Sequence, residues 1–84
     1  MELTKTIVEM VKKVSGSDED IPEDLHETNL EDLPDHKIDS LAHMEMIMFL
    51  EDIHEIVIDD GLFDSLRTIS DFERIIGRLK EEQN

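Results

Sequence analysis

Apolar residues recur at helical spacing in three stretches of the chain. In the first, apolar residues at positions 3, 7, 10, 11 and 14 are separated mainly by lysine and glutamate. This spacing predicts an amphipathic helix over about residues 2–14. Ser15-Gly16-Ser17 follows it, and glycine is the usual residue just past a helix end. A second helix is predicted over about 39–55 and a third over about 69–80.

The third helix has a start signal and a buried stripe. Thr68 and Asp71 have the spacing of a capping box, in which each side chain bonds to the other's backbone. Phe72, Ile75, Ile76 and Leu79 then repeat at helical spacing. We expect the last residues, 80–84, to fray into solvent. Upstream, an extended connection over 56–58 precedes a short helix over about 60–66.

The connection between the first two helices, residues 15–38, is long, polar and acidic, with prolines at positions 22 and 34. A structureless loop of this length is unusual in a small domain. We expect its apolar residues, Ile21, Leu25, Leu30 and Leu33, to pin it across the helices. The stretch 28–33 has the pattern of a short helical turn before Pro34.

These elements predict an all-α fold: a small bundle of three main helices plus one short helix, with a long first loop, in a single domain over residues 1–84. Hydrophobic residues make up 38% of the chain, and Trp, Tyr and Cys are absent. The core must therefore be built mainly from Ile, Leu, Val and Met.

The second helix has two apolar stripes. At about 100° per residue, one stripe is a normal core face: Met46, Ile47, Leu50 and Ile53. The other lies nearly opposite and is flanked by Glu45, Asp52 and, less closely, Glu51; it consists of Leu41, Met44 and Met48. In a chain this small, a second apolar stripe predicts a face presented to a partner.

The charge of the chain narrows the choice of partner. Asp and Glu number 23 against 8 Lys and Arg, a formal net charge of −15. Nucleic acid and anionic membranes would be repelled, whereas basic patches on other proteins would be attracted. The simpler alternative is that the acid only keeps the protein soluble. The lack of cysteine, of a signal-peptide pattern and of a long apolar run predicts a cytoplasmic protein.

Ser40 lies at the start of the second helix, in Asp39-Ser40-Leu41. A catalytic serine needs an oriented base; His36 and His43 are near in sequence, but no glycine-rich elbow surrounds Ser40. The simplest interpretation is a helix cap. The alternative is an attachment point, since a phosphodiester there would lie at the positive end of a helix.

Neither the histidines nor the acidic runs predict a metal site. His26, His36, His43 and His54 lack the short spacings of structural zinc sites. The acidic runs at 18–20 and 59–61 lack the pattern of a calcium loop. We therefore expect no catalytic residue and no metal ligand.

The stretch Ile38-Asp39-Ser40-Leu41-Ala42-His43-Met44-Glu45-Met46 resembles the phosphopantetheine attachment motif of the acyl carrier protein family, which is Asp-Ser-Leu followed by an amphipathic acidic helix. The stretches 28–33, 50–52, 55–60 and 67–71 follow the family's order and spacing, so the likeness covers nearly the whole chain.

The resemblance implies that a phosphopantetheinyl transferase attaches 4'-phosphopantetheine from coenzyme A to Ser40, and that Asp39 helps to position the magnesium ion of this transferase. It implies a monomeric carrier without catalytic activity of its own, serving acyl-loading and chain-elongating enzymes that have basic patches. The residues that match the family's partner-binding face are Leu41, Met44, Glu45, Met48, Glu51 and Asp52.

Two positions depart from the family pattern. Lys37 stands where the family usually has glycine, and His54 stands where a buried Phe is common, so that Ile53 or Phe49 is expected to fill the lost volume. Both departures favour a dedicated carrier of one pathway over the housekeeping fatty-acid carrier. The function predicted is a stand-alone carrier for fatty acid, polyketide or related secondary-metabolite biosynthesis. Alternatives are an aminoacyl or peptidyl carrier of a nonribosomal-peptide-type pathway and an unmodified acidic adaptor protein.

Overall fold

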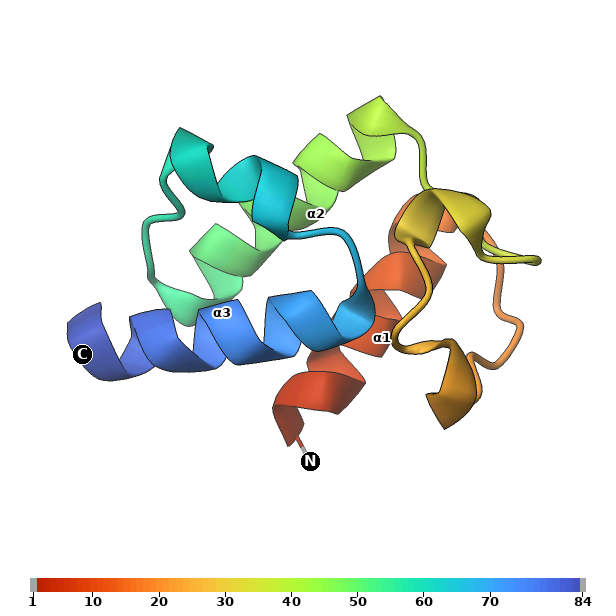
Figure 1. The fold of residues 1–84 in the computed structure, drawn as a ribbon, viewed down its shortest axis with the longest axis horizontal. Helices are drawn as coiled ribbons and strands as arrows, with labels where there is room; N and C mark the ends of the chain where they lie inside the picture. Colours follow the sequence, from red (N-terminus) through yellow and green to blue (C-terminus); the bar gives the residue numbers. More distant parts are fainter. Residues whose placement is uncertain (1, 84) are drawn as a thin grey trace.

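The computed structural model describes residues 2–83, and its elements are helical (Figure 1). The three α-helices are α1 (Glu2–Ser15), α2 (Ser40–His54) and α3 (Ile69–Gln83). Three short 3-10 helices lie between them: η1 (Glu23–Leu25), η2 (Leu30–Asp32) and η3 (Asp60–Ser65). The predicted all-α fold with three main helices and a long first loop is confirmed. Within residues 2–83, no helix combines the length and apolar character needed to cross a membrane.

Helix α1 ends where the glycine signal predicts. The backbone N–H groups of Gly16 and Ser17 both donate to the carbonyl of Lys12, at 3.0 and 3.2 Å. Gly16 has φ of +73°, a left-handed conformation that costs glycine little because it has no Cβ. Upstream, Ile7 and Val11 are fully buried, and α1 packs against both α2 and α3 (Figure 1).

The predicted capping box opens α3. The N–H of Asp71 donates to Thr68 Oγ1 at 3.0 Å, and the N–H of Thr68 donates to Asp71 Oδ2 at 3.1 Å. Burial alone raises the pKa of Asp71, but hydrogen bonds from the backbone of Arg67, from Arg74 and from Thr68 outweigh it and leave the pKa below its ordinary value. The predicted stripe of α3, Phe72, Ile75, Ile76 and Leu79, is buried.

The expected fraying at the C-terminus is wrong for residues 80–83; Asn84 lies outside the described residues. Helix α3 continues to Gln83. The Gln83 amide makes two hydrogen bonds to Val57: Nε2 donates to the Val57 carbonyl at 3.0 Å, and the Val57 N–H donates to Oε1 at 2.8 Å. This pair ties the last turn of α3 to the connection that follows α2, which sequence periodicity does not reveal.

The long first loop is pinned as expected and is joined to the start of α3. Leu30 and Leu33 are buried, and η2 is the helical turn predicted before Pro34. The N–H of Leu30 donates to the carbonyl of Arg67 at 2.9 Å, and the N–H of Ser70 donates to the carbonyl of His26 at 3.0 Å. The loop therefore lies beside the junction of η3 and α3, opposite the start of α2.

The core face of α2 is narrower than predicted. Met46, Ile47 and Leu50 are buried, but Ile53 is 53% exposed and Phe49 is 37% exposed. The expectation that either would fill a lost core volume is wrong.

His54, near the end of α2, is half-buried. Burial first, and then the positive charge of Lys80, lower the pKa of His54 below its ordinary value of 6.5. The folded state therefore takes up the proton less readily than the unfolded chain. As the pH falls through 6.5, the unfolded state is protonated first, so His54 makes the fold less stable in acid.

Replacing His54 with leucine should reduce the amount of stability that the fold loses when the pH falls from about 7.5 to about 5.5. The melting temperature of the wild type should fall more over this range than that of His54→Leu. Lys80→Gln removes only the positive charge near His54. The fall in its melting temperature over this pH range should therefore lie between those of the wild type and His54→Leu. Equal slopes for the wild type and His54→Leu would contradict this assignment.

Candidate functional site

Asp39 caps α2 and thereby fixes the position of Ser40. Asp39 has extended backbone, and its Oδ1 accepts a hydrogen bond from the N–H of Ala42 at 2.8 Å. Its carbonyl accepts the bond from the N–H of His43 at 2.9 Å. Ser40 is thus the first helical residue, and its side chain is not the cap. Of the two interpretations of Ser40, the plain helix cap is therefore wrong, because Asp39 fills that role.

Ser40 is exposed, and exposed apolar side chains extend from it along α2. Leu41 is 71% exposed, Met44 46% and Met48 62%. The predicted exposure of the second stripe is confirmed, while its use by a partner stays a prediction. Exposed large apolar side chains grouped on one helix face are typical of interaction sites.

The acidic residues of this face differ in their surroundings. Glu45 and Asp52 are exposed. Glu51 is half-buried, and its Oε2 accepts a hydrogen bond from the N–H of Ile58 at 2.7 Å. Glu51 therefore holds the connection after α2, whereas Glu45 and Asp52 are the carboxylates that a partner can reach.

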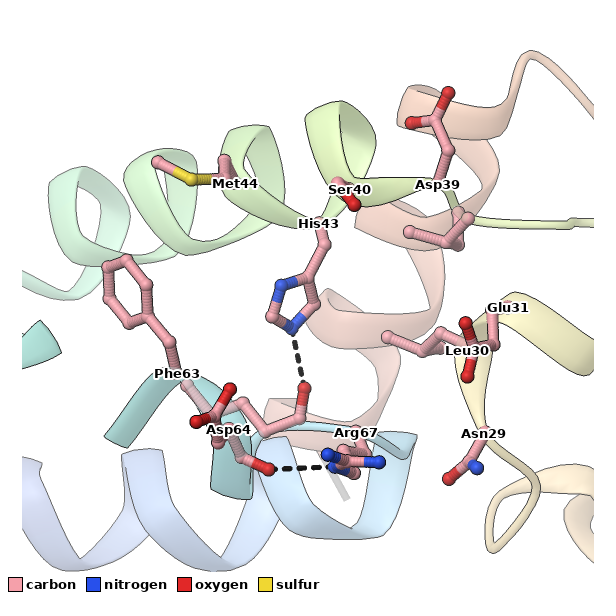
Figure 2. Close-up of a pocket in the computed structure, with 12 residues that line it drawn as sticks. Asn29, Leu30, Glu31, Asp39, Ser40, His43, Met44, Phe63, Asp64 and Arg67 are labelled. Carbon is pink, nitrogen blue, oxygen red and sulfur yellow. Dashed lines mark hydrogen bonds between the residues drawn. The ribbon is translucent and has the colours of Figure 1, made fainter. Parts of the chain in front are cut away.

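A pocket of about 410 Å³ opens beside Ser40 (Figure 2). One side is formed by α2, with Ser40, His43 and Met44, and by the preceding Ile38 and Asp39. The other sides are formed by η2 and Asn29 before it, and by the end of η3 and the residues after it; these are Asn29, Leu30, Glu31, Phe63, Asp64, Leu66 and Arg67. Figure 2 shows the Asp39 carboxylate pointing away from the pocket.

His43 spans this pocket and does not act on Ser40. Its Nε2 lies 2.6 Å from the carbonyl oxygen of Leu66, and because that oxygen can only accept, Nε2 carries the hydrogen. His36, the other neighbouring histidine, is buried, with 3% exposed. Across residues 2–83 neither imidazole forms a hydrogen bond with Ser40, so the arrangement lacks the base that a nucleophilic serine needs.

No cluster of three or more His, Cys, Asp or Glu side chains within residues 2–83 is arranged to hold a metal ion.

Lys37 has an ordinary negative φ, since Glu55 is the non-glycine residue of this range with positive φ. The family that the sequence resembles usually has glycine at this position, but the backbone conformation here does not require one. The Lys37 side chain is exposed.

Sequence reasoning did not find the far wall of the pocket. His43 follows Ser40 by three residues, a spacing that places both on one side of a helix, and this could have indicated its place. Asp64 and Arg67 gave no such signal. They reach the pocket because the backbone bond between Leu30 and Arg67 joins η2 to the end of η3.

Comparison with known proteins gave no match to a family model, to a curated protein or to a solved structure.

Because Asp39 and not Ser40 caps α2, replacing each with alanine should have different effects. Asp39→Ala should lower the free energy of unfolding by about 1 kcal/mol, since it removes the bond to Ala42. Ser40→Ala should change it by less than about 0.5 kcal/mol, as expected for a surface position without such a role. Urea unfolding measures both; an equal loss in the two variants would contradict the assignment of the cap.

Proposed function

We propose that this chain is an acyl carrier protein that bears 4'-phosphopantetheine on Ser40. One observation supports this most: Ser40 is an exposed first residue of α2 that is relieved of capping by Asp39 and lies beside exposed apolar side chains. When attached, the arm supplies a terminal thiol that holds an acyl group as a thioester. The chain itself performs no catalysis.

The attachment step needs only an accessible hydroxyl on this chain. In the transferase, Ser40 Oγ forms a bond to the phosphorus that carries the pantetheine of coenzyme A. The phosphoanhydride bond breaks, 3',5'-ADP leaves, and the hydroxyl proton passes to a base of the transferase. The lack of a base hydrogen-bonded to Ser40 among residues 2–83 is compatible with this role, because the activating groups belong to the transferase.

The start of α2 suits both the phosphodiester product on Ser40 and the transferase that forms it. A phosphodiester on Ser40 lies at the positive end of a fifteen-residue helix, where the first N–H groups stabilise an anion. Asp39 uses Oδ1 for the cap. Oδ2 is then the oxygen that can help to position the magnesium ion of the transferase, the role that the family resemblance implies for this residue.

The face around Ser40 suits basic partner enzymes. Leu41, Met44 and Met48 supply apolar contact area, and the exposed carboxylates of Glu45 and Asp52 lie beside them. A net charge of −15 speeds the approach of positively charged surfaces. The partners proposed are the transferase and enzymes that load and extend acyl groups in fatty acid, polyketide or related biosynthesis.

Incubation with coenzyme A and a promiscuous phosphopantetheinyl transferase should add one phosphopantetheine to the protein. The gain should be absent in Ser40→Ala, and Ser65→Ala, which changes another exposed serine, should gain the arm like the wild type. Intact-protein mass spectrometry measures this. No gain with several transferases would contradict the proposal and favour an unmodified adaptor that binds through the same face.

Met48→Glu should reduce kcat/KM for the transferase by about tenfold or more, equivalent to about 1.4 kcal/mol, because it places a charge in the apolar contact. The fold should persist, since Met48 is 62% exposed. Val57→Glu is the matched control, because Val57 is 70% exposed but lies outside α2. An unchanged rate for Met48→Glu, or loss of its helical circular dichroism, would contradict the proposed face.

A further inference from the structure

The inner wall of the Ser40 pocket is closed by His43. The imidazole donates to the carbonyl of Leu66 over 2.6 Å and meets the ring of Phe72 edge-on, with the ring centroids 5.9 Å apart and the planes at 71°. Figure 2 shows the ring reaching from α2 across the pocket to the end of η3. The His43 side chain therefore connects α2 to the end of η3. Without it, the pocket would extend deeper between these two elements.

The core behind this wall is filled. Phe72 and Met46 are each 0% exposed, and neither is among the lining residues of the pocket. An alkyl chain could enter between the helices only if the His43 ring moved and these side chains were displaced. Moving the ring would also leave the Leu66 carbonyl without its donor, which is unfavourable for a shielded polar group. The structure thus opposes entry by both packing and hydrogen bonding.

The pocket itself is mixed in character. Apolar surface comes from Leu30, Ile38, Met44, Phe63 and Leu66, while Asn29, Glu31, Asp64 and Arg67 bring polar groups to the lining. The Arg67 guanidinium is oriented by a bond of 2.9 Å from Nε to the carbonyl of Asp64. Such a lining gives an acyl group apolar contact at the surface, outside the helical core.

We propose that His43 determines where the cargo lies: it keeps an acyl group carried on Ser40 in the surface pocket and out of the helical core. This inference rests on the proposed function. It assigns a role to a residue that the attachment chemistry itself does not use. A chain longer than the pocket remains in contact with solvent.

The test loads Ser40 with acetyl, butanoyl, hexanoyl and octanoyl phosphopantetheine from the corresponding coenzyme A thioesters, and measures the melting temperature of each form. Methylenes in the open pocket stay partly in water, whereas each methylene that enters the core loses that contact and stabilises the folded state more strongly. The melting temperature of the wild type should therefore rise little with chain length. The melting temperature of His43→Ala, which opens the wall, should rise steeply as the chain grows.

His54→Ala is the matched control. It removes an imidazole from the same helix, but His54 does not line the pocket, so the melting temperature of this variant should depend on chain length as little as that of the wild type. Amide chemical shifts of Met46 and Phe72, which are not among the lining residues of the pocket, give a second measurement. In the wild type they should be the same for the acetyl and octanoyl forms, which keeps the test decisive if His43→Ala does not fold.

The outcomes separate the two proposals. A mass gain on Ser40 with a melting temperature that rises as steeply in the wild type as in His43→Ala, or with shifted Met46 and Phe72 amides in the wild type, overturns the role of His43 and leaves the carrier function standing. A folded His43→Ala that shows no dependence on chain length also overturns it. No mass gain on Ser40 overturns the carrier function and this inference together.

Discussion

The hydrogen bond from the N–H of Ala42 to Asp39 Oδ1 is the interaction on which the candidate site depends. It fixes the residue at which α2 begins, and so makes Ser40 an exposed first helical residue instead of a cap. If the helix began one residue later, Ser40 would be the cap, and its hydroxyl would be engaged with the N–H groups of the first turn.

Most of the fold could be predicted because its signals are local. Gly16 ends α1, and the reciprocal bonds of Thr68 and Asp71 open α3, as the sequence pattern indicated. The exposed stripe of α2 was also predictable, since helical spacing alone separates Leu41 and Met48 from the core face. Signals of this kind depend on residues within one or two turns of each other, so they survive whatever tertiary structure follows.

The features that could not be predicted depend on how distant elements cross. Ile53 has the periodicity of a core residue, yet it is 53% exposed, because periodicity gives the side of a helix and not which part of that side a distant element covers. Gln83 looked like part of a polar tail, yet its amide bonds both backbone groups of Val57. The same holds for the pocket: His43 reaches Leu66 across twenty-three positions of sequence, a contact that no local pattern encodes.

The central claim is that Ser40 carries a covalent phosphopantetheine arm. It is tested most directly by peptide mapping of the protein purified from the cells that produce it. Trypsin cuts after Lys37 and Arg67, and the intervening peptide of residues 38–67 holds two serines, Ser40 and Ser65. The account predicts that fragmentation of this peptide locates one phosphopantetheine on Ser40. A peptide recovered wholly unmodified, or modified on Ser65, would contradict it.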